Sequence, residues 1–179
     1  MAELNPTDTT IMEKMRTNPD EGMRLLMGEY QEKLYWHVRR LVVYEDDAEG
    51  LLQEIFIKIY LKFDSFKGNS SLFSWIYRLA TNETLSFLRR KKVNKVPLDN
   101  VRTQAADPFF EYGDKEAVAL QEAIHALPAK QQMVFNMRYY DELSFKQIAE
   151  ITCSSENAAK ANYCFAKQKI IERMKLLEV

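Results

Sequence analysis

The sequence predicts an all-α protein made of two small helical domains that a flexible acidic linker joins. Apolar residues recur at helical spacing along most of the 179 residues, while glycine and proline occur only five times each. Nearly half of the residues are apolar, so two small domains can each bury a core. Residues 96–113 hold two prolines, show little periodicity and separate the two helical parts, which makes them the expected linker.

Capping residues and apolar stripes predict three helices in the first part of the chain. Asn18 can cap a helix that begins with a proline, and apolar residues then follow at helical spacing. The acidic segment 46–49 starts a second helix, whose apolar stripe continues to residue 63. Gly, Asn and Ser in the segment 64–71 break the pattern, and a third helix is expected over about 72–90.

The segment 142–170, ELSFKQIAEITCSSENAAKANYCFAKQKI, predicts a helix-turn-helix. Ser144 and Gln147 have the spacing of a capping box in front of a short apolar helix. After a brief turn, Ser155 can cap a longer helix, and Ala149 is small where the two helices must cross. In such a motif the second helix enters the major groove with its N-terminal turns leading. An amphipathic hairpin inside a helical bundle fits the same pattern, with its lysines on a solvated face.

The net charge of −1 conceals three regions of different sign. Residues 89–95 carry five bases and no acid, and residues 144–175 carry six bases and three acids. Between them, residues 99–122 hold six acids and two bases. Two basic patches on either side of an acidic connector predict two contacts with one polyanion.

Several function classes have no support in the sequence. The start of the chain lacks a signal peptide and no apolar run is long enough to span a bilayer, which predicts a cytoplasmic protein without membrane insertion. Cys153 and Cys164 are too few for a disulfide framework and are expected as packing residues, with a redox role less expected. His37 and His125 are remote from each other, and no catalytic array or phosphate-binding loop occurs, so no enzyme, metal or cofactor is expected.

Two blocks of the sequence resemble extracytoplasmic-function (ECF) sigma factors of the sigma-70 family. DDAEGLLQEIFIKIYLKF followed by FSWIYRLATNETLSFLRRKK is similar to their N-terminal domain. LPAKQQMVFNMRYYDELSFKQIAEITCSSENAAKANYCFAKQKI is similar to their promoter-binding C-terminal domain. The resemblance implies sigma region 2 at residues 18–96, a linker at 97–114 and the region 4 helix-turn-helix at 115–179. It also implies a protein that binds core RNA polymerase, recognises the −35 and −10 promoter elements and helps to open the duplex.

The resemblance assigns three groups of site residues. Docking on core polymerase is implied for Asp47, Gln53, Glu54 and Ile57. Contact with the −10 element, with an extruded base captured by the loop FKGNSS, is implied for Phe66, Lys67, Asn69, Ser70, Trp75, Asn82, Arg89 and Arg90. Contact with the −35 element is implied for Ser155, Asn157, Lys160, Asn162, Tyr163 and Lys167. Lysine suits phosphate and asparagine suits an adenine edge, while capture of a base requires unstacking.

Structural alternatives stand beside these roles. Gln53 and Glu54 can be solvent-exposed helix formers, Trp75 can be a core aromatic residue, and FKGNSS can be an ordinary interhelical loop. The basic residues that follow Arg89 can be a solvated helix end that favours the helix dipole.

The sequence departs from the family pattern at several of these positions. Gly50 stands where the family usually has an acid, and Cys153 stands where it usually has a glycine. Cysteine at a turn that needs a positive φ is expected to be strained or to change the turn. Asn162 and Phe165 replace frequent arginines, which weakens the expected phosphate anchoring.

The resemblance further implies an anti-sigma factor, commonly membrane-associated, as a partner beside core polymerase and promoter DNA. The near-neutral charge favours weak contacts with DNA that act together once polymerase holds both domains. The alternative is a free-standing helix-turn-helix repressor or activator, which would bind a palindromic site as a dimer. The sequence shows no dimerisation heptad or ligand-pocket signature that would support this alternative.

Overall fold

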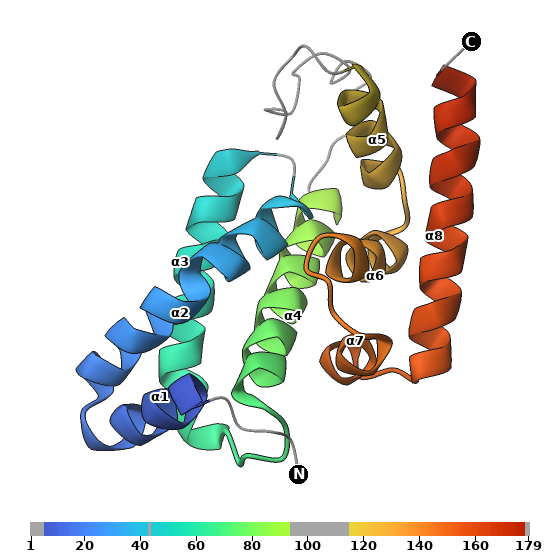
Figure 1. Ribbon diagram of the computed structural model, residues 1–179. Helices are drawn as coiled ribbons and strands as arrows, with labels where there is room; N and C mark the ends of the chain where they lie inside the picture. Colours follow the sequence, from blue (N-terminus) through green and yellow to red (C-terminus); the bar gives the residue numbers. More distant parts are fainter. Residues whose placement is uncertain (1–5, 43, 94–114, 178–179) are drawn as a thin grey trace.

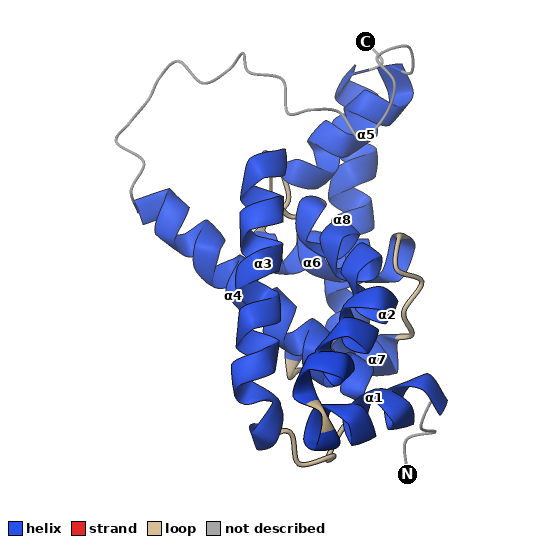
Figure 2. Cartoon of the chain, turned by 90° about the vertical axis from the view of Figure 1, so that its left-hand side faces the viewer, coloured by secondary structure: helices blue, strands red, loops and turns tan. Residues whose placement is uncertain are grey.

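A computed structural model describes residues 6–42, 44–93 and 115–177, and all regular elements in these ranges are helical (Figures 1 and 2), which confirms the predicted all-α class. The elements are α1 (Pro6–Thr17), α2 (Pro19–Arg39), α3 (Glu45–Lys62), η1 (Phe63–Ser65), α4 (Leu72–Val93), α5 (Lys115–His125), α6 (Ala129–Tyr139), α7 (Phe145–Thr152) and α8 (Glu156–Leu177). The expected linker at 97–114 lies outside the described residues. None of the helices in the described ranges is long and apolar enough to cross a membrane.

Helix α1, which the sequence patterns did not predict, packs closely on α2. Asn18 caps α2 by accepting a hydrogen bond from the backbone of the first turn, as expected. Gly22 lets the two helices touch, because a Cβ there would lie 2.4 Å from the backbone nitrogen of Met15. On the same side, the hydroxyl of Tyr30 donates to the carboxylate of Asp8 at 2.6 Å, and both residues are buried. Helix α1 is therefore a tightly docked part of the first bundle.

The core of the first bundle lies between α2, α3 and α4. Leu26, Leu34, Ile55, Ile59 and Ile76 are fully buried there. Each such side chain contributes about 1.5–3 kcal/mol relative to an exposed position. Helix α3 begins at Glu45, one residue before the expected acidic start, and its three acids lie in the first turn, where the helix dipole favours them.

The second half of the described chain contains the predicted helix-turn-helix, formed by α7 and α8. The capping box is present, with the Ser144 and Gln147 side chains each bonded to the other's backbone. Cys153 ends α7 in the left-handed conformation, with φ 50° and ψ 45°. The Ser155 hydroxyl then accepts from the backbone N–H of Ala158 at 3.1 Å and caps α8. The local signals read from the sequence are thus confirmed.

Helix α8 runs along one side of the molecule beside α5, α6 and α7 (Figure 1). Its 22 residues correspond to about 33 Å at about 1.5 Å per residue. A second, smaller core joins its middle to α5 and α6 through Ala123, Ile124, Leu127, Phe135, Ala166 and Ile170. One straight element therefore connects the turn of the helix-turn-helix to α5.

The two helical units contact each other directly. Helix α4 lies between the α2–α3 pair and α7, and residues of both units share one apolar core (Figure 1). Ile76 of α4 and Met137 and Ile148 of the second unit belong to this shared core, and all three are fully buried.

Candidate nucleic-acid and protein interfaces

One face of α4 carries a polar and basic row of side chains. Trp75, Asn82 and Arg89 follow at seven-residue intervals, which is two helical turns, so they share this face. Asn82, Arg89 and Arg90 are exposed, and an Arg89 guanidinium nitrogen donates to the hydroxyl of Ser86 at 3.0 Å. The last turns of α4 reach the edge of the molecule (Figure 2). The row offers amide and guanidinium donors to a phosphate backbone or a base edge.

Trp75 anchors the start of this face in an aromatic cluster. Its ring lies 6.2 Å from the ring of Phe63 in an edge-on arrangement and 5.3 Å from the ring of Phe66. Trp75 is half-buried, and Phe66 is only 7% exposed. The structure therefore places Phe66, a candidate for contact with DNA, inside the core. The buried Phe66 ring packs against Trp75 and anchors the start of the loop between η1 and α4.

The loop between η1 and α4 presents polar groups beside that cluster. Lys67 and Asn69 are exposed, and Ser70 is half-buried. Gly68 adopts a φ of +74°, a conformation that glycine reaches without a steric penalty. At the loop's end, the Ser71 hydroxyl accepts from the backbone N–H of Ser74 and caps α4. The loop thus has one cation, one amide and hydroxyl groups on a frame fixed at both ends.

A shallow apolar groove lies on the outer side of α2 and α3, and we call it the α3 groove. It has a volume of about 490 Å³ and is lined by Met23, Met27, Gln53, Phe56, Ile57, Tyr60 and Leu61. Ile57, Tyr60 and Leu61 are 59%, 46% and 72% exposed, an unusual cluster for large apolar side chains. Glu54 is exposed on the same helix. An exposed apolar groove beside polar residues is typical of a protein-binding surface.

The candidate docking residues differ in exposure and in the contacts they make within the chain. Gln53, Glu54 and Ile57 are exposed, whereas Asp47 forms an ion pair with Lys91 of α4. The Lys91 ammonium also lies 4.6 Å from the ring centre of Tyr44. A partner that binds Asp47 must therefore displace an ion pair within the chain. Sequence reasoning missed Tyr60 and Leu61, although their spacing of three and four residues after Ile57 places all three side by side.

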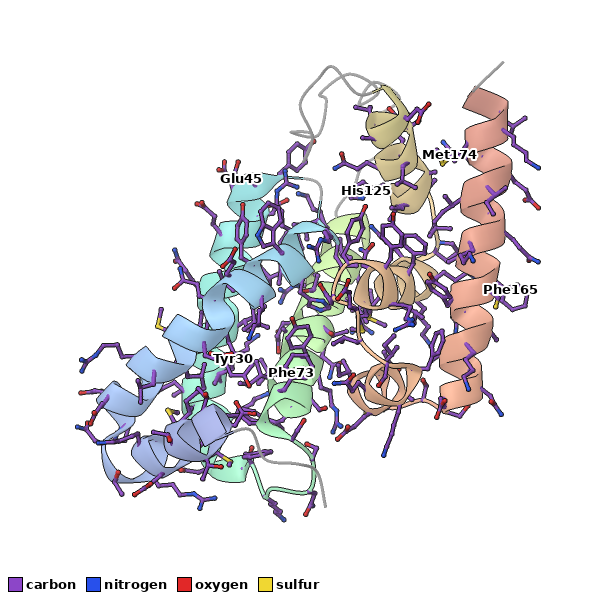
Figure 3. All side chains as sticks on the ribbon, in the orientation of Figure 1. Tyr30, Glu45, Phe73, His125, Phe165 and Met174 are labelled. Atoms are coloured by element: carbon purple, nitrogen blue, oxygen red, sulfur yellow. The ribbon has the colours of Figure 1, made fainter. Side chains whose placement is uncertain are left out.

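The outer face of α8 brings together part of the candidate set for the −35 element. Asn157, Lys160 and Lys167 are exposed at spacings of three and seven residues, which places them on one side of the helix. Lys160 pairs with Glu156 at 2.8 Å in the first turn. Cys164 shares this face and is exposed, so the expectation that it packs inside the protein is wrong. Phe165 projects from the outer side of α8 and is 54% exposed (Figure 3).

The structure turns other candidates of this set toward the protein. The Asn162 amide donates to the backbone oxygen of Ala158 at 2.9 Å. The Tyr163 ring stacks on Phe135 with centres 5.7 Å apart, and it meets Phe145 edge-on at the same distance. The Ser155 hydroxyl is occupied as the helix cap. Asn162 and Tyr163 therefore support the helix, while Asn157, Lys160 and Lys167 face solvent.

Burial affects titratable groups away from these faces. Burial lowers the pKa of His125, at the end of α5, and the positive charge of Arg39 acts in the same direction. Burial also raises the pKa of Tyr77 on α4. Within the described part of the chain, no group of three or more His, Cys, Asp or Glu side chains could hold a metal ion.

Comparisons with known proteins cover most of the chain. The family model for sigma-70 region 2 matches residues 26–93, and that for sigma-70 region 4 matches residues 117–170. The ECF RNA polymerase sigma-E factor of Escherichia coli (strain K12) is 28% identical over 186 residues, which covers 96% of each chain. The ECF RNA polymerase sigma factor SigW of Bacillus subtilis (strain 168) is 31% identical over 139 residues, covering 68% of this chain and 72% of SigW.

Two solved structures share the fold. CnrH, in complex with the cytosolic domain of CnrY, matches with a TM-score of 0.74 and 14% identity, covering 95% of this chain and 98% of CnrH. The sigma factor RpoE of Bartonella quintana, in complex with the anti-sigma factor NepR, matches with a TM-score of 0.66 and 22% identity. That match covers 85% of this chain and 96% of RpoE.

Proposed function

The chain belongs to the ECF group of the sigma-70 family of RNA polymerase sigma factors, which direct transcription initiation, and we propose that it acts through three separate surfaces. These are the α3 groove, the polar face of α4 with its loop, and the outer face of α8. Residues 18–96 would form region 2 and residues 115–179 region 4. The observation that supports the proposal most strongly is the presence of two exposed DNA-compatible faces on separate helical units beside an open apolar groove.

The α3 groove is the proposed docking site for core polymerase. Its apolar side chains would leave water on binding, and Gln53 and Glu54 would supply polar contacts that fix the orientation. Ile57→Asp places a charge in the groove, so we expect affinity for core polymerase to fall by about 10- to 100-fold. Glu54→Ala should weaken binding less.

The matched control for Ile57→Asp is Leu176→Asp, because Leu176 is 78% exposed near the end of α8. This control should bind core polymerase as the unaltered chain does. Equal affinities for the two aspartate variants, measured by fluorescence anisotropy, would remove the α3 groove from the proposal.

The α4 face and its loop are the proposed reader of the −10 element. Asn69 and Ser70 of the loop, with Asn82, would bind an extruded base, while Lys67 and Arg89 would contact phosphates. Extrusion costs a few kcal/mol, which contacts with the flipped base must offset. Asn82→Ala should therefore reduce strand opening, measured by permanganate reactivity at the −10 element, and spare duplex binding.

Arg89→Ala separates the two roles on α4. It should weaken binding irrespective of sequence and lower the slope of log K against log salt by about 1. If Asn82→Ala leaves opening unchanged, the proposed base site is misplaced.

The outer face of α8 is the proposed reader of the −35 element. Lys160 would contact a phosphate, but it is paired with Glu156 in the free protein, so the two interactions compete. Lys160→Ala should weaken binding to a promoter and reduce its salt slope by about 0.9. Glu156→Gln should strengthen the same binding, since it frees the ammonium and removes a negative charge near DNA. A decrease with both variants would contradict this arrangement.

We also propose an anti-sigma factor as a partner and the cytoplasm as the place of action. The support is that the two solved structures described above each contain a protein partner, NepR being an anti-sigma factor. A tagged chain recovered from its host would identify core polymerase and such a partner, and the partner's own sequence would show whether it is membrane-associated. Transcription from purified core polymerase only when the chain is added would support the sigma role. Tight duplex binding without any polymerase contact would favour a free-standing repressor or activator instead.

A further inference from the structure

The middle of the outer face of α8 is apolar. Ala161, Cys164 and Phe165 are exposed there, in the second and third turns of the helix, and we call these three residues the apolar strip. Phe165 is 54% exposed and projects away from the core (Figure 3), whereas Tyr163, two positions earlier, stacks on Phe135. None of the three side chains in the strip offers a strong hydrogen-bond donor or acceptor, so the strip cannot read the polar edge of a base.

Basic residues border the apolar strip on both sides. At about 100° per residue, Lys160 and Lys167 lie on one side of the strip and Lys169 lies on the other. All three are exposed, and the Lys169 ammonium donates to the side-chain oxygen of Gln131 on α6 at 3.0 Å. Glu172, two turns beyond the strip, ends this arrangement, because its charge repels phosphates. The charge pattern is complementary to the two phosphate walls of a major groove, with the apolar strip facing the base edges between them.

Thymine is the base whose major-groove edge matches an apolar side chain. It carries a methyl group on C5, a feature that the other three bases lack. Phe165 has the largest side chain of the strip, and its ring can cover a methyl group that otherwise faces water. Arginine, which is frequent in the family at this position, pairs instead with guanine or with a phosphate. The replacement of arginine by phenylalanine therefore changes which base this position of the helix favours.

We propose that Phe165 is a specificity-determining residue that contacts the 5-methyl group of a thymine in the −35 element. The inference rests on the proposed function, because it requires α8 to enter the major groove. The flanking lysines contact phosphates, which carry no sequence information, so selection of the base falls to the residues between them. Removal of the methyl group from the DNA should lower affinity about fourfold, the factor expected for burial of one methyl-sized group.

The test removes the methyl group from the DNA and the ring from the protein, separately and together. Holoenzyme formed from the full chain and purified core polymerase would first select its −35 sequence from duplexes randomised over that element. Each selected thymine would then be replaced by uracil, which keeps the base pair and lacks only the methyl group. Dissociation constants for the thymine and uracil duplexes would be measured with the unaltered chain, with Phe165→Ala and with Leu176→Ala.

The expected result is that uracil at one selected thymine or more weakens binding of the unaltered chain about fourfold. Phe165→Ala should bind the thymine and uracil duplexes equally. Leu176→Ala is the matched control, because Leu176 is a large apolar residue on the same side of α8 and is 78% exposed. It lies about 16 Å further along the helix, beyond the roughly 12 Å width of the major groove, so this variant should keep the preference for thymine. Circular dichroism would verify that Phe165→Ala retains its helices.

Two outcomes would overturn the inference. A selected −35 element in which no thymine responds to uracil would show that α8 reads no methyl group there, even if Lys160→Ala weakens binding to that element. A preference for thymine that persists in Phe165→Ala would show that another residue makes the contact, and would leave a protein partner as the occupant of the apolar strip. Holoenzyme that enriches no −35 sequence and starts no transcription would instead refute the proposed function, and the inference with it.

Discussion

Replacing Cys153 with glycine is expected to stabilise the protein. Cys153 ends α7 with φ 50° and ψ 45°, so its backbone is in the left-handed region, where a Cβ is crowded. The neighbouring N–H of Ser154 donates to the Ala149 oxygen at 2.9 Å, so the turn is fixed by the end of the helix. The side chain is exposed, and its removal leaves no cavity. The sequence reading allowed either strain or a different turn, and the observed conformation is the strained one.

Two opposing terms set the magnitude of this change. A left-handed residue with a Cβ costs about 1–2 kcal/mol, and glycine avoids that cost. Glycine also adds about 0.4–1 kcal/mol of conformational entropy to the unfolded chain, which acts against folding. The net expectation is a gain of about 0.5–1 kcal/mol in the free energy of unfolding. For a chain of this size that corresponds to a rise in Tm of about 1–4 °C.

Urea denaturation followed by circular dichroism, with a reductant present, would measure the change. The same chemical substitution at Cys164 is the matched control, because Cys164 is also exposed but lies inside α8. Glycine there should lower the free energy of unfolding by a few tenths of a kcal/mol to about 1 kcal/mol. If both glycine variants shift stability in the same direction, the conformation of residue 153 is not what governs the effect.

Three further changes should alter stability in defined directions, each measured by urea denaturation. Gly22→Ala pushes a Cβ into the backbone of α1 and should lower the free energy of unfolding by about 1–3 kcal/mol. The control Gly28→Ala lies in open space on the same helix and should raise the free energy of unfolding by up to about 1 kcal/mol. Equal effects of the two variants would contradict the close crossing of α1 and α2. Tyr30→Phe removes the 2.6 Å hydrogen bond to buried Asp8 and should cost about 1–3 kcal/mol; no loss would mean that the carboxylate is solvated. Burial lowers the pKa of His125 below its usual 6.5, so on acidification the unfolded chain binds the proton before the folded chain does. The free energy of unfolding should therefore fall as the pH drops from about 6.5 through the folded pKa. His125→Gln should make the free energy of unfolding less dependent on pH in this range.

Local signals in the sequence predicted most helix limits, because capping acts within about four residues. Asn18, Ser144 and Ser155 all cap the helices expected of them. Helix α1 was not predicted, since its buried side chains, such as Ile11 and Met15, offer only a short apolar pattern. Its stability comes from docking on α2, which is a tertiary effect.

The candidate site was only partly predictable, because the sequence does not say which way each side chain faces. Asn82 and Lys160 are exposed, as a contact role requires, but Phe66 and Tyr163 pack inward. Aromatic residues occur on both sides of their helices, so spacing alone could not separate core from surface. The hydrogen bond between Arg40 and Asp141 was also outside the reach of local patterns, because the two residues lie 101 positions apart in the sequence.

The length of α8 makes it a lever as well as a candidate surface for DNA. Its first turns would meet the −35 element, while Ala166 and Ile170, further along, are fixed in the core shared with α5. A tilt of about 5° about this fixed point, which lies roughly 15 Å from the first turn at about 1.5 Å per residue, moves that turn by about 1–2 Å, which is enough to weaken a hydrogen bond. Under the proposed function, we therefore expect packing substitutions around α5, at positions outside the candidate DNA-binding face, to alter promoter preference.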